Sequence, residues 1–290
     1  MSTPLYLGVD GGGTNCRARL SDDRGRILGE GRGGPANIRL GGERAYAAIL
    51  EAARQALVQA GLSEEHLAGL HVGLGLAGVN VAQVRDAFLA LPSPFAHVRL
   101  VCDATIACLG AHGGEDGGIV IIGTGSNALA RVGGRTISLG GWGFELSDQG
   151  SGAVMGQRAL RLALLAHQGL RPATALSRAL MARWQDDPER LFLWGAAARP
   201  GDYAALMPLI LEHAAACDML ALELLSEGAA EIGALVDALL RHGAPCVSLL
   251  GGLAGVMAQW LAPPLRARLV EPRGDALDGA LLLARGEVAA

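Results

Sequence analysis

The sequence predicts an α/β protein of two domains related by duplication, with a cleft between them. Its 290 residues suit two compact domains of about 100–200 residues each. A glycine-rich string also occurs twice. Gly13-Thr14-Asn15 with Ala18-Arg19 is matched, 112 residues later, by Gly125-Ser126-Asn127 with Ala130-Arg131. Each string lies between two predicted strands, which indicates the same position in a repeated domain.

The first repeat is predicted to begin with three antiparallel strands. Residues 5–10 form a short apolar run, residues 16–20 alternate, and the turn Asp22-Asp23-Arg24-Gly25 precedes Ile27-Leu28. Apolar spacing then predicts alternating helices and strands. They are a helix at 43–60 ended by Gly61, a strand at 69–76, a helix at 81–91, a strand at 98–102 and a helix from Ala104.

The second repeat is predicted to follow the same order, with helical insertions between residues 151 and 226. It closes with a strand at 246–250, a helix at 253–261, a strand at 266–270 and a helix at 276–285. We expect an N-terminal domain at 1–112 and a C-terminal domain at 113–290, divided near Gly113-Gly114. The last helix is free to pack back on the N-terminal domain.

Composition excludes several classes of protein. All 24 basic residues are arginine, so the essential lysine of P-loop kinases, protein kinases and pyridoxal enzymes is missing. A net charge of −4 argues against a nucleic-acid or anionic-membrane partner. The five cysteines form no C-x-x-C, and no signal peptide is visible, so we expect a reduced cytoplasmic protein.

Two glycine loops predict phosphate binding. In Asp10-Gly11-Gly12-Gly13-Thr14, glycines let backbone N–H groups approach an anion, the Thr14 hydroxyl adds a donor, and Asp10 is suited to hold Mg²⁺ through water. Gly123-Thr124-Gly125-Ser126-Asn127 is its repeat partner. Two such loops facing each other could grip the phosphates of ATP without a lysine. The alternative is a pair of ordinary glycine turns.

Asp103 is the candidate general base. It follows the apolar strand at 98–102 and precedes a helix, and the carboxyl ends of strands face the ligand in open α/β sheets. An acid there can take the proton of a substrate hydroxyl during phosphoryl transfer. The alternative, compatible with this role, is an N-cap of the helix.

The loop at 140–152 is the candidate sugar site. It combines Trp142 with Glu145 and Asp148, and carboxylates bind hydroxyls while aromatic rings pack on sugar rings. The alternative is that Asp148 or Ser151 simply caps the following helix. Asn37 lies in a Gly/Pro loop and is alternatively a turn residue. Gly251-Gly252, between a strand and a helix, suits close approach of adenosine.

These strings resemble known motifs. The two glycine loops and Gly251-Gly252 are similar to the phosphate and adenosine motifs of the sugar kinase/actin/chaperone ATPase superfamily. Gly140-Gly141-Trp142-Gly143 and Ser147-Asp148-Gln149-Gly150-Ser151 resemble the BadF/BadG and N-acetylglucosamine kinase-type ATPases, and the sequence around them is most similar to bacterial glucosamine kinases. The resemblance implies two ribonuclease-H-like, actin-like ATPase domains. It also implies ATP- and Mg²⁺-dependent phosphorylation of the 6-hydroxyl of an amino sugar.

The resemblance also implies roles by position. Asp103 matches the catalytic base, Thr14 and Thr124 match positions at the ATP phosphates, and Asn37, Asn127, Gly141–Gly143 and Asp148 match the sugar site. With the residue-based candidates, the nucleotide set is Gly11, Gly12, Gly13, Thr14, Thr124, Gly125, Ser126, Gly251 and Gly252. The substrate set is Asn37, Asp103, Asn127, Gly141, Trp142, Gly143, Glu145 and Asp148.

The sugar's 2-substituent stays open between two alternatives. Trp142-Gly143 looks more like the N-acetylglucosamine kinases, whereas a carboxylate at Glu145 favours the ammonium of glucosamine, which we prefer. Two other functions are a BadF-type ATPase activator and a non-catalytic sugar sensor. An activator needs a bridging iron–sulfur cluster, and the loop at 140–152 contains no cysteine. The partners expected are ATP and an amino sugar, and a homodimer is one option for the assembly.

Overall fold

The computed structural model describes residues 4–288. Contacts divide the chain into two units, of which the first contains Met1–Gly117, Arg131–Thr136 and Glu271–Ala290. The second contains Gly118–Ala130 and Ile137–Val270. The outer ends of the two predicted domains, residues 1–3 and 289–290, lie outside the described residues. The division at residue 112 stays a prediction.

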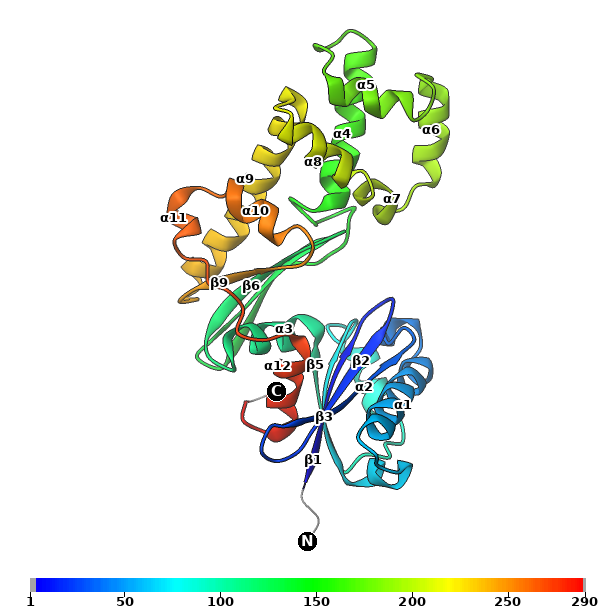
Figure 1. Ribbon diagram of the computed structural model, residues 1–290, viewed down its shortest axis with the longest axis vertical. Coiled ribbons are helices and arrows are strands. Elements are labelled where there is room, and N and C mark those ends of the chain that lie inside the picture. The colour runs from blue at the N-terminus through cyan, green and yellow to red at the C-terminus, as the bar shows by residue number, and fades with distance from the viewer. Residues whose placement is uncertain (1–3, 289–290) are drawn as a thin grey trace. The chain divides into compact units, whose positions relative to one another are not determined.

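The first unit is built on a five-stranded mixed sheet (Figure 1). Its strands are β1 (Leu5–Gly11), β2 (Cys16–Ser21), β3 (Ile27–Gly33), β4 (Leu70–Leu76) and β5 (His97–Cys102), in the order β3-β2-β1-β4-β5. β1 pairs antiparallel with β2 and parallel with β4, and β4 pairs parallel with β5. The two predicted hairpins and the two later strands are confirmed.

Helices cover both faces of this sheet. The connections contain α1 (Gly42–Gln59), α2 (Ala82–Leu89), α3 (Asp103–His112) and the 3₁₀ turns η1 (Ile38–Leu40) and η2 (Glu64–Gly69). α1 packs on β2 and β3, whereas α12 (Ala276–Arg285) packs on β1, β4 and α3. The helices predicted at 43–60, 81–91 and 276–285 are therefore confirmed.

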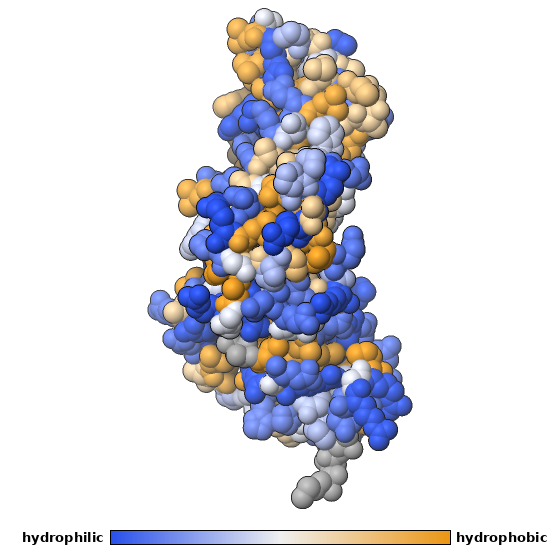
Figure 2. Space-filling view, turned by 90° about the vertical axis from the view of Figure 1, so that its left-hand side faces the viewer, coloured by the Kyte–Doolittle hydropathy of each residue, from blue (hydrophilic) through white to orange (hydrophobic). Residues whose placement is uncertain are grey.

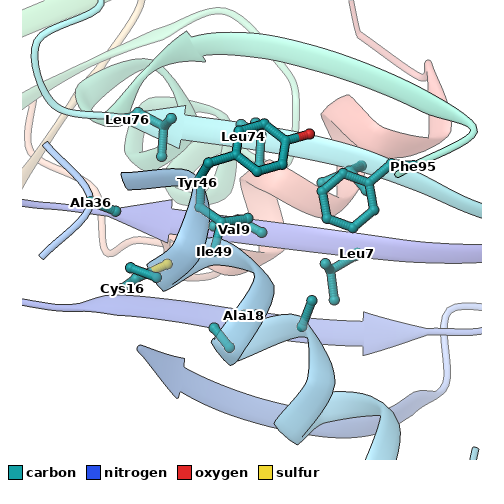
Figure 3. Close-up of a cluster of buried hydrophobic side chains, with 14 of the residues drawn as sticks. Leu7, Val9, Cys16, Ala18, Ala36, Tyr46, Ile49, Leu74, Leu76 and Phe95 are labelled. Carbon is teal, nitrogen blue, oxygen red and sulfur yellow. The ribbon is translucent and has the colours of Figure 1, made fainter. Parts of the chain in front are cut away.

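The core of the first unit lies between the sheet and α1 (Figure 3). Leu7 and Val9 alternate along β1 and are fully buried, as are Ala18 of β2 and Ile49 of α1. Side chains on one face of a strand recur every second residue, and those on one face of a helix every third or fourth. The strand period of two and the helix period of three to four therefore place the apolar side chains of β1, β2 and α1 in one layer between the sheet and the helix. Burial of this layer fixes which face of the sheet packs on α1.

The second sheet, most of which belongs to the second unit, repeats this topology with one strand fewer. Its strands are β6 (Gly117–Ile122), β7 (Ser126–Val132), β8 (Arg135–Gly140) and β9 (Val247–Leu250), in the order β8-β7-β6-β9. β6 and β9 are parallel, as β1 and β4 are in the first sheet. The shared order supports the predicted duplication.

The strand predicted at 266–270 is wrong. Residues Pro263–Arg266 form the short helix α11, and only Leu269 pairs, through an isolated bridge to Val247. Proline is favoured in the first turn of a helix, because its fixed φ suits the helix and its missing N–H would have no partner there. Two prolines therefore start a helix at this point and leave too few residues for a strand.

The remaining helices belong to the second unit. They are α4 (Gly152–His167), α5 (Ala175–Ala182), α6 (Pro188–Ala197), α7 (Pro200–Ala204), α8 (Met207–Ala215), α9 (Met219–Arg241) and α10 (Ala254–Trp260). Between residues 4 and 288, no single helix is long and apolar enough to cross a membrane. The pair Pro200–Ala215 and Met219–Arg241, bent by 116°, meets the length and composition criteria together. On the face shown in Figure 2, apolar residues form separate patches among charged ones.

Candidate active site

The first glycine loop (residues 11–14) joins β1 to β2. Gly12 N–H donates to the Asn15 carbonyl at 2.9 Å, and the Gly12 carbonyl accepts from Ala36 N–H at 2.9 Å. A Cβ on Gly13 would meet no atom within 4 Å, and on Gly12 only the Asn15 carbonyl at 3.8 Å. Neither glycine is among those with positive φ. The protein's own packing therefore does not require glycine at 12 or 13, whereas close approach of a ligand to the backbone would.

Two other predicted residues of this loop differ in their surroundings. A Cβ on Gly11 would lie 2.5 Å from Leu76 Cδ2 and 2.8 Å from Ala36 Cβ, so packing in the core accounts for this glycine. Thr14 is exposed, and its hydroxyl is available to a ligand. The nucleotide role predicted for both stays a prediction.

Asp10, the candidate magnesium ligand, is ion-paired. Arg17 Nη2 lies 2.7 Å from Asp10 Oδ2, and the two residues are direct partners in the β1–β2 register. Mg²⁺ at nucleotide sites commonly uses one or two carboxylates together with phosphate oxygens and waters, so a single half-buried carboxylate beside the glycine loop fits it. Sequence analysis missed Arg17, although its place opposite Asp10 follows from the hairpin once the turn is known.

Asp103 is the first residue of α3, directly after β5. Its Oδ1 accepts a hydrogen bond from Ala104 N–H at 2.9 Å, and the N-cap position belongs to Cys102. Burial raises the pKa of Asp103; the Ala104 N–H lowers it, and the negative charge of Asp10 raises it further. The interpretation of Asp103 as an N-cap is therefore wrong. The carboxylate instead lies at the end of a strand, and its raised pKa gives it a strengthened tendency to accept a proton.

Asn37 caps the 3₁₀ turn η1. Its Oδ1 accepts from Arg39 N–H at 3.0 Å, and Ile38 N–H donates to the Ala77 carbonyl at 3.1 Å. Ala77 N–H in turn donates to the Gly11 carbonyl at 2.9 Å. The chain after β3 is thus tied to the same sheet edge as the first glycine loop. Asn37 has the turn role that sequence analysis left as its alternative, and its sugar role stays a prediction.

The second glycine loop (residues 123–127) is braced by the start of α4. Gly152 N–H donates to the Gly123 carbonyl at 2.9 Å, and Ala153 N–H to the Thr124 carbonyl at 3.1 Å. Ser126 Oγ donates to the Gln149 carbonyl at 2.7 Å. The Thr124 side chain is exposed, and a Cβ on Gly123 would meet no atom within 4 Å. Distant residues therefore hold this loop in shape and leave Gly123 and Thr124 accessible.

Asp148 lies against this second loop. A Cβ on Gly125 would be 2.7 Å from Asp148 Oδ2, and the Asp148 carboxylate accepts from Ser126 N–H. Burial raises the pKa of Asp148, the Ser126 N–H lowers it, and Glu145 raises it. Asp148 also has a φ of 65°, which is strained for a residue with a side chain. Ser151 caps α4, since its Oγ accepts from Val154 N–H at 3.3 Å, so Asp148 is not needed as the cap.

Asn127 carries a buried polar atom that lacks a partner. Among the side chains of residues 4–288, its Oδ1 is one of a few buried oxygens or nitrogens without a hydrogen bond in the protein. The side chain lies beside Gly141, whose φ is 75° and whose added Cβ would be 3.3 Å from Asn127 Cβ. Buried acceptors are almost always satisfied, so a partner from outside the chain is indicated.

The sugar loop (residues 140–152) exposes several of the predicted residues. Trp142 is 78% exposed, Glu145 is also exposed, and Gly143 has a φ of 91° with its carbonyl accepting from Ser147 N–H at 2.7 Å. Phe144 is anchored, because its ring stacks on Tyr203 of α7 with centroids 5.5 Å apart. The Gly143–Ser147 hydrogen bond and the Phe144–Tyr203 contact therefore hold the loop, while the side chains of Trp142 and Glu145 are exposed to solvent.

Gly251 and Gly252 follow β9, as predicted. Gly251 has a φ of 93°, and its close approach to Ile122 at the end of β6 excludes any Cβ. A Cβ on Gly252 would meet no atom within 4 Å. Leu253 N–H donates to the Ile122 carbonyl at 3.1 Å, which brings this turn to the edge of the sheet where the second glycine loop begins. Gly251 is thus required by the fold, whereas Gly252 is open to a ligand.

The chain is similar to known sugar kinases. It is 44% identical to the glucosamine kinase of Vibrio cholerae over 96% of this chain and 95% of that protein. It is 28% identical to the N-acetyl-D-glucosamine kinase of Dictyostelium discoideum over 83% and 81%. A crystal structure from Chromobacterium violaceum, described as a candidate N-acetylglucosamine kinase, superposes with a TM-score of 0.86 at 37% identity, covering 98% of this chain and 100% of that one.

These comparisons confirm the resemblance and the fold class. The fold is α/β, with two ribonuclease-H-like domains of the actin-like ATPase type. The family model for BadF/BadG/BcrA/BcrD ATPases matches residues 7–284, which is nearly the whole chain. From the β1 strand to the end of α12, therefore, this chain belongs to the BadF/BadG/BcrA/BcrD ATPase family.

Proposed function

We propose that this protein is an ATP-dependent amino-sugar kinase that converts glucosamine to glucosamine 6-phosphate. The observation that carries the proposal is the 44% identity to a glucosamine kinase along nearly the whole of both chains. Independent support comes from the site. The pKa of the Asp103 carboxyl is raised, mainly by burial and further by the charge of Asp10, and Asn127 holds a buried oxygen without a partner.

In the proposed reaction, Asp103 accepts the proton of the sugar 6-hydroxyl. The hydroxyl oxygen forms a bond to the γ-phosphorus of ATP, and the bond from that phosphorus to the bridging oxygen of ADP breaks. A raised pKa makes a carboxylate a better proton acceptor at neutral pH. Most of the remaining rate enhancement in phosphoryl transfer comes from positioning and charge neutralisation.

Backbone amides and a bound Mg²⁺ would take the place of the missing lysine in this proposal. Gly12, Gly13 and Gly123 leave room for phosphate oxygens next to the backbone. Asp10 would hold Mg²⁺, which supplies positive charge at the phosphates when bound. Arg17 keeps the Asp10 carboxylate in place through its 2.7 Å ion pair.

A coupled assay of ADP release over a panel of hexoses and amino sugars tests the function. We expect turnover with glucosamine, 6-phosphorylated product, and ADP formation that depends on both the sugar and Mg²⁺. ADP release at the same rate with and without every sugar would reject the kinase and favour an ATPase of another kind.

The preference for glucosamine rests on Glu145. An exposed carboxylate in the sugar loop favours an ammonium group at the sugar's 2-position and disfavours the neutral acetamide. We expect kcat/KM to be higher for glucosamine than for N-acetylglucosamine, and Glu145→Gln to reduce that ratio several-fold. A parent enzyme that prefers N-acetylglucosamine refutes the assignment of substrate. An unchanged ratio in the variant refutes the charge argument alone.

N-acetylglucosamine is the second candidate substrate. It is favoured by the similarity to the Dictyostelium enzyme and to the Chromobacterium structure. We further propose that the enzyme acts in the cytoplasm, where ATP is available, on small molecules rather than on nucleic acid or a membrane. A homodimer is the assembly to test first, by measurement of molecular mass in solution.

A further inference from the structure

A carboxylate that is distant in sequence from the predicted site residues accepts a hydrogen bond from the end of the sugar loop. Glu231 lies in the middle of α9, in the helical part of the second unit, 81 residues from Gly150 in sequence. Its Oε2 accepts a hydrogen bond from Gly150 N–H at 2.5 Å. No predicted function of the site uses Glu231, and no sequence motif identifies it.

The contact is possible because α9 and the sugar loop approach very closely. A Cβ on Gly150 would lie 2.6 Å from the Gly228 carbonyl and 2.7 Å from Ile232 Cγ1. Gly150 also has a φ of 69° and is buried. Without Glu231 its buried N–H would lose its acceptor, which carries a larger cost than the loss of an exposed hydrogen bond.

The segment that Glu231 holds also carries Asp148. Asp148 has a φ of 65° and is 9% exposed, and its carboxylate accepts from Ser126 N–H in the second glycine loop. Gln149, the residue between Asp148 and Gly150, accepts from Ser126 Oγ through its carbonyl at 2.7 Å. Three consecutive residues are thus fixed, two against the second glycine loop and one against α9. A strained conformation such as that of Asp148 persists only where its surroundings determine it.

We propose that Glu231 is a positioning residue for the phosphate and sugar groups of this site. By holding Gly150, it keeps Asp148 in its left-handed conformation and keeps Ser126 aligned in the second glycine loop. Glu231 itself touches neither substrate. The inference rests on the proposed kinase function for its kinetic test, and on the geometry alone for its structural test.

The kinetic test compares three substitutions of Glu231 with a matched control. Glu231→Met keeps the length of the side chain without an acceptor, and we expect kcat/KM for the sugar to fall about tenfold or more, as for other losses of a positioned group. Glu231→Gln retains an amide oxygen as acceptor and should restore most of the activity. Glu231→Ala repeats the test if the methionine variant does not fold.

Asp237→Ala is the control, because Asp237 lies on the same helix and its exposed carboxylate accepts from Arg241 Nε at 2.9 Å. We expect this variant to retain the kinetic constants of the parent. Parent-like kinetics in Glu231→Met and Glu231→Ala, or an equal loss in Asp237→Ala, would overturn the proposal.

Amide hydrogen exchange separates this inference from the proposed function. In Glu231→Met we expect faster exchange in the peptides that cover residues 126 and 147–150, with little change in the first unit. This readout needs no turnover. If the parent phosphorylates no amino sugar, the proposed function fails while exchange still tests the role of Glu231. Unchanged exchange at Gly150 in the methionine variant would overturn it.

Discussion

We expect the charged Asp103 side chain to lower the stability of the folded protein and to be essential for catalysis. Its folded-state pKa is raised, mainly by burial, so the charged form that catalysis requires is disfavoured in the folded protein. We expect Asp103→Asn to lower kcat about 100-fold or more, because a general base typically contributes 10²–10⁴-fold. The same variant should unfold at a higher temperature than the parent at pH 7, since it removes a disfavoured charge.

Steady-state kinetics and thermal unfolding of the ligand-free protein check both expectations. As the pH rises, kcat/KM should increase when Asp103 loses its proton. Because the pKa of Asp103 is raised, we expect this increase at a higher pH than for an aspartate of ordinary pKa. A variant with near-normal kcat would reduce Asp103 to a structural residue of α3.

The glycines of the first and second glycine loops differ in the side chains that they tolerate. An alanine at Gly13 or Gly123 meets no protein atom, so we expect the fold to be retained and KM for ATP to rise far more than KM for the sugar. Gly69→Ala is the matched control, since its Cβ also meets no atom within 4 Å. Unchanged KM for ATP in both loop variants would refute phosphate binding by these loops. Gly125 is a poorer test, because its Cβ would displace Asp148.

At the scale of elements, three strands share a row of aromatic side chains that responds to pH. Tyr6, His71 and His97 are register partners on β1, β4 and β5, with centroids 5.5 Å apart for the first pair and 4.6 Å for the second. Arg285 of α12 lies over the Tyr6 ring, and Arg99 Nη1 of β5 donates to the Leu283 carbonyl of α12 at 3.0 Å. Burial, His97 and Arg99 together lower the pKa of His71, in that order of importance.

This row predicts a loss of stability in mild acid. Because His71 has a lower pKa folded than unfolded, its contribution is full above the unfolded value of about 6.5 and is lost as the pH falls below it. We expect the free energy of unfolding to decrease between about pH 7 and pH 5, and His71→Gln to make that decrease smaller. Denaturant unfolding of both proteins across this range measures it. An identical pH dependence in the variant would exclude His71 as a cause.

For the whole molecule, the decisive element is α12. It is the last element of the second repeat in sequence but packs on β1, β4 and α3 of the first unit. Gly8 lacks a side chain where α12 crosses the sheet, since a Cβ there would lie 2.7 Å from the Leu277 carbonyl. Arg19 of β2 adds ion pairs of 2.9 Å to Asp275 and 2.6 Å to Asp278, at the start of α12.

Removal of residues 271–290 should therefore unfold the first unit. The truncation uncovers one face of the sheet and leaves Arg19, whose side chain is only 17% exposed, without its two partners on the helix. We expect the truncated protein to aggregate or to lose cooperative unfolding. Circular dichroism and size-exclusion chromatography check this. A truncated protein that unfolds cooperatively at the parent's temperature would contradict it.

The sequence by itself determined most of the elements, the fold class and the family of the protein. Strand and helix periods, the repeated glycine strings and the position of Asp103 after a buried strand all depend on residues close together in the chain, where local spacing carries the information. The family motifs at 10–14, 123–127 and 140–151 are of the same local kind, and they led to the correct family and fold class.

Only the tertiary structure decided which residues hold the site in place. It showed that Asp103 is not the cap of α3, that Leu269 makes a bridge instead of a strand, and that Gly125 is required by Asp148. The contact of Glu231 with Gly150 joins residues 81 apart. Such contacts depend on how helices and loops pack in the folded protein. The spacing of residues along the sequence reports only local structure, so it cannot predict which distant segments will touch.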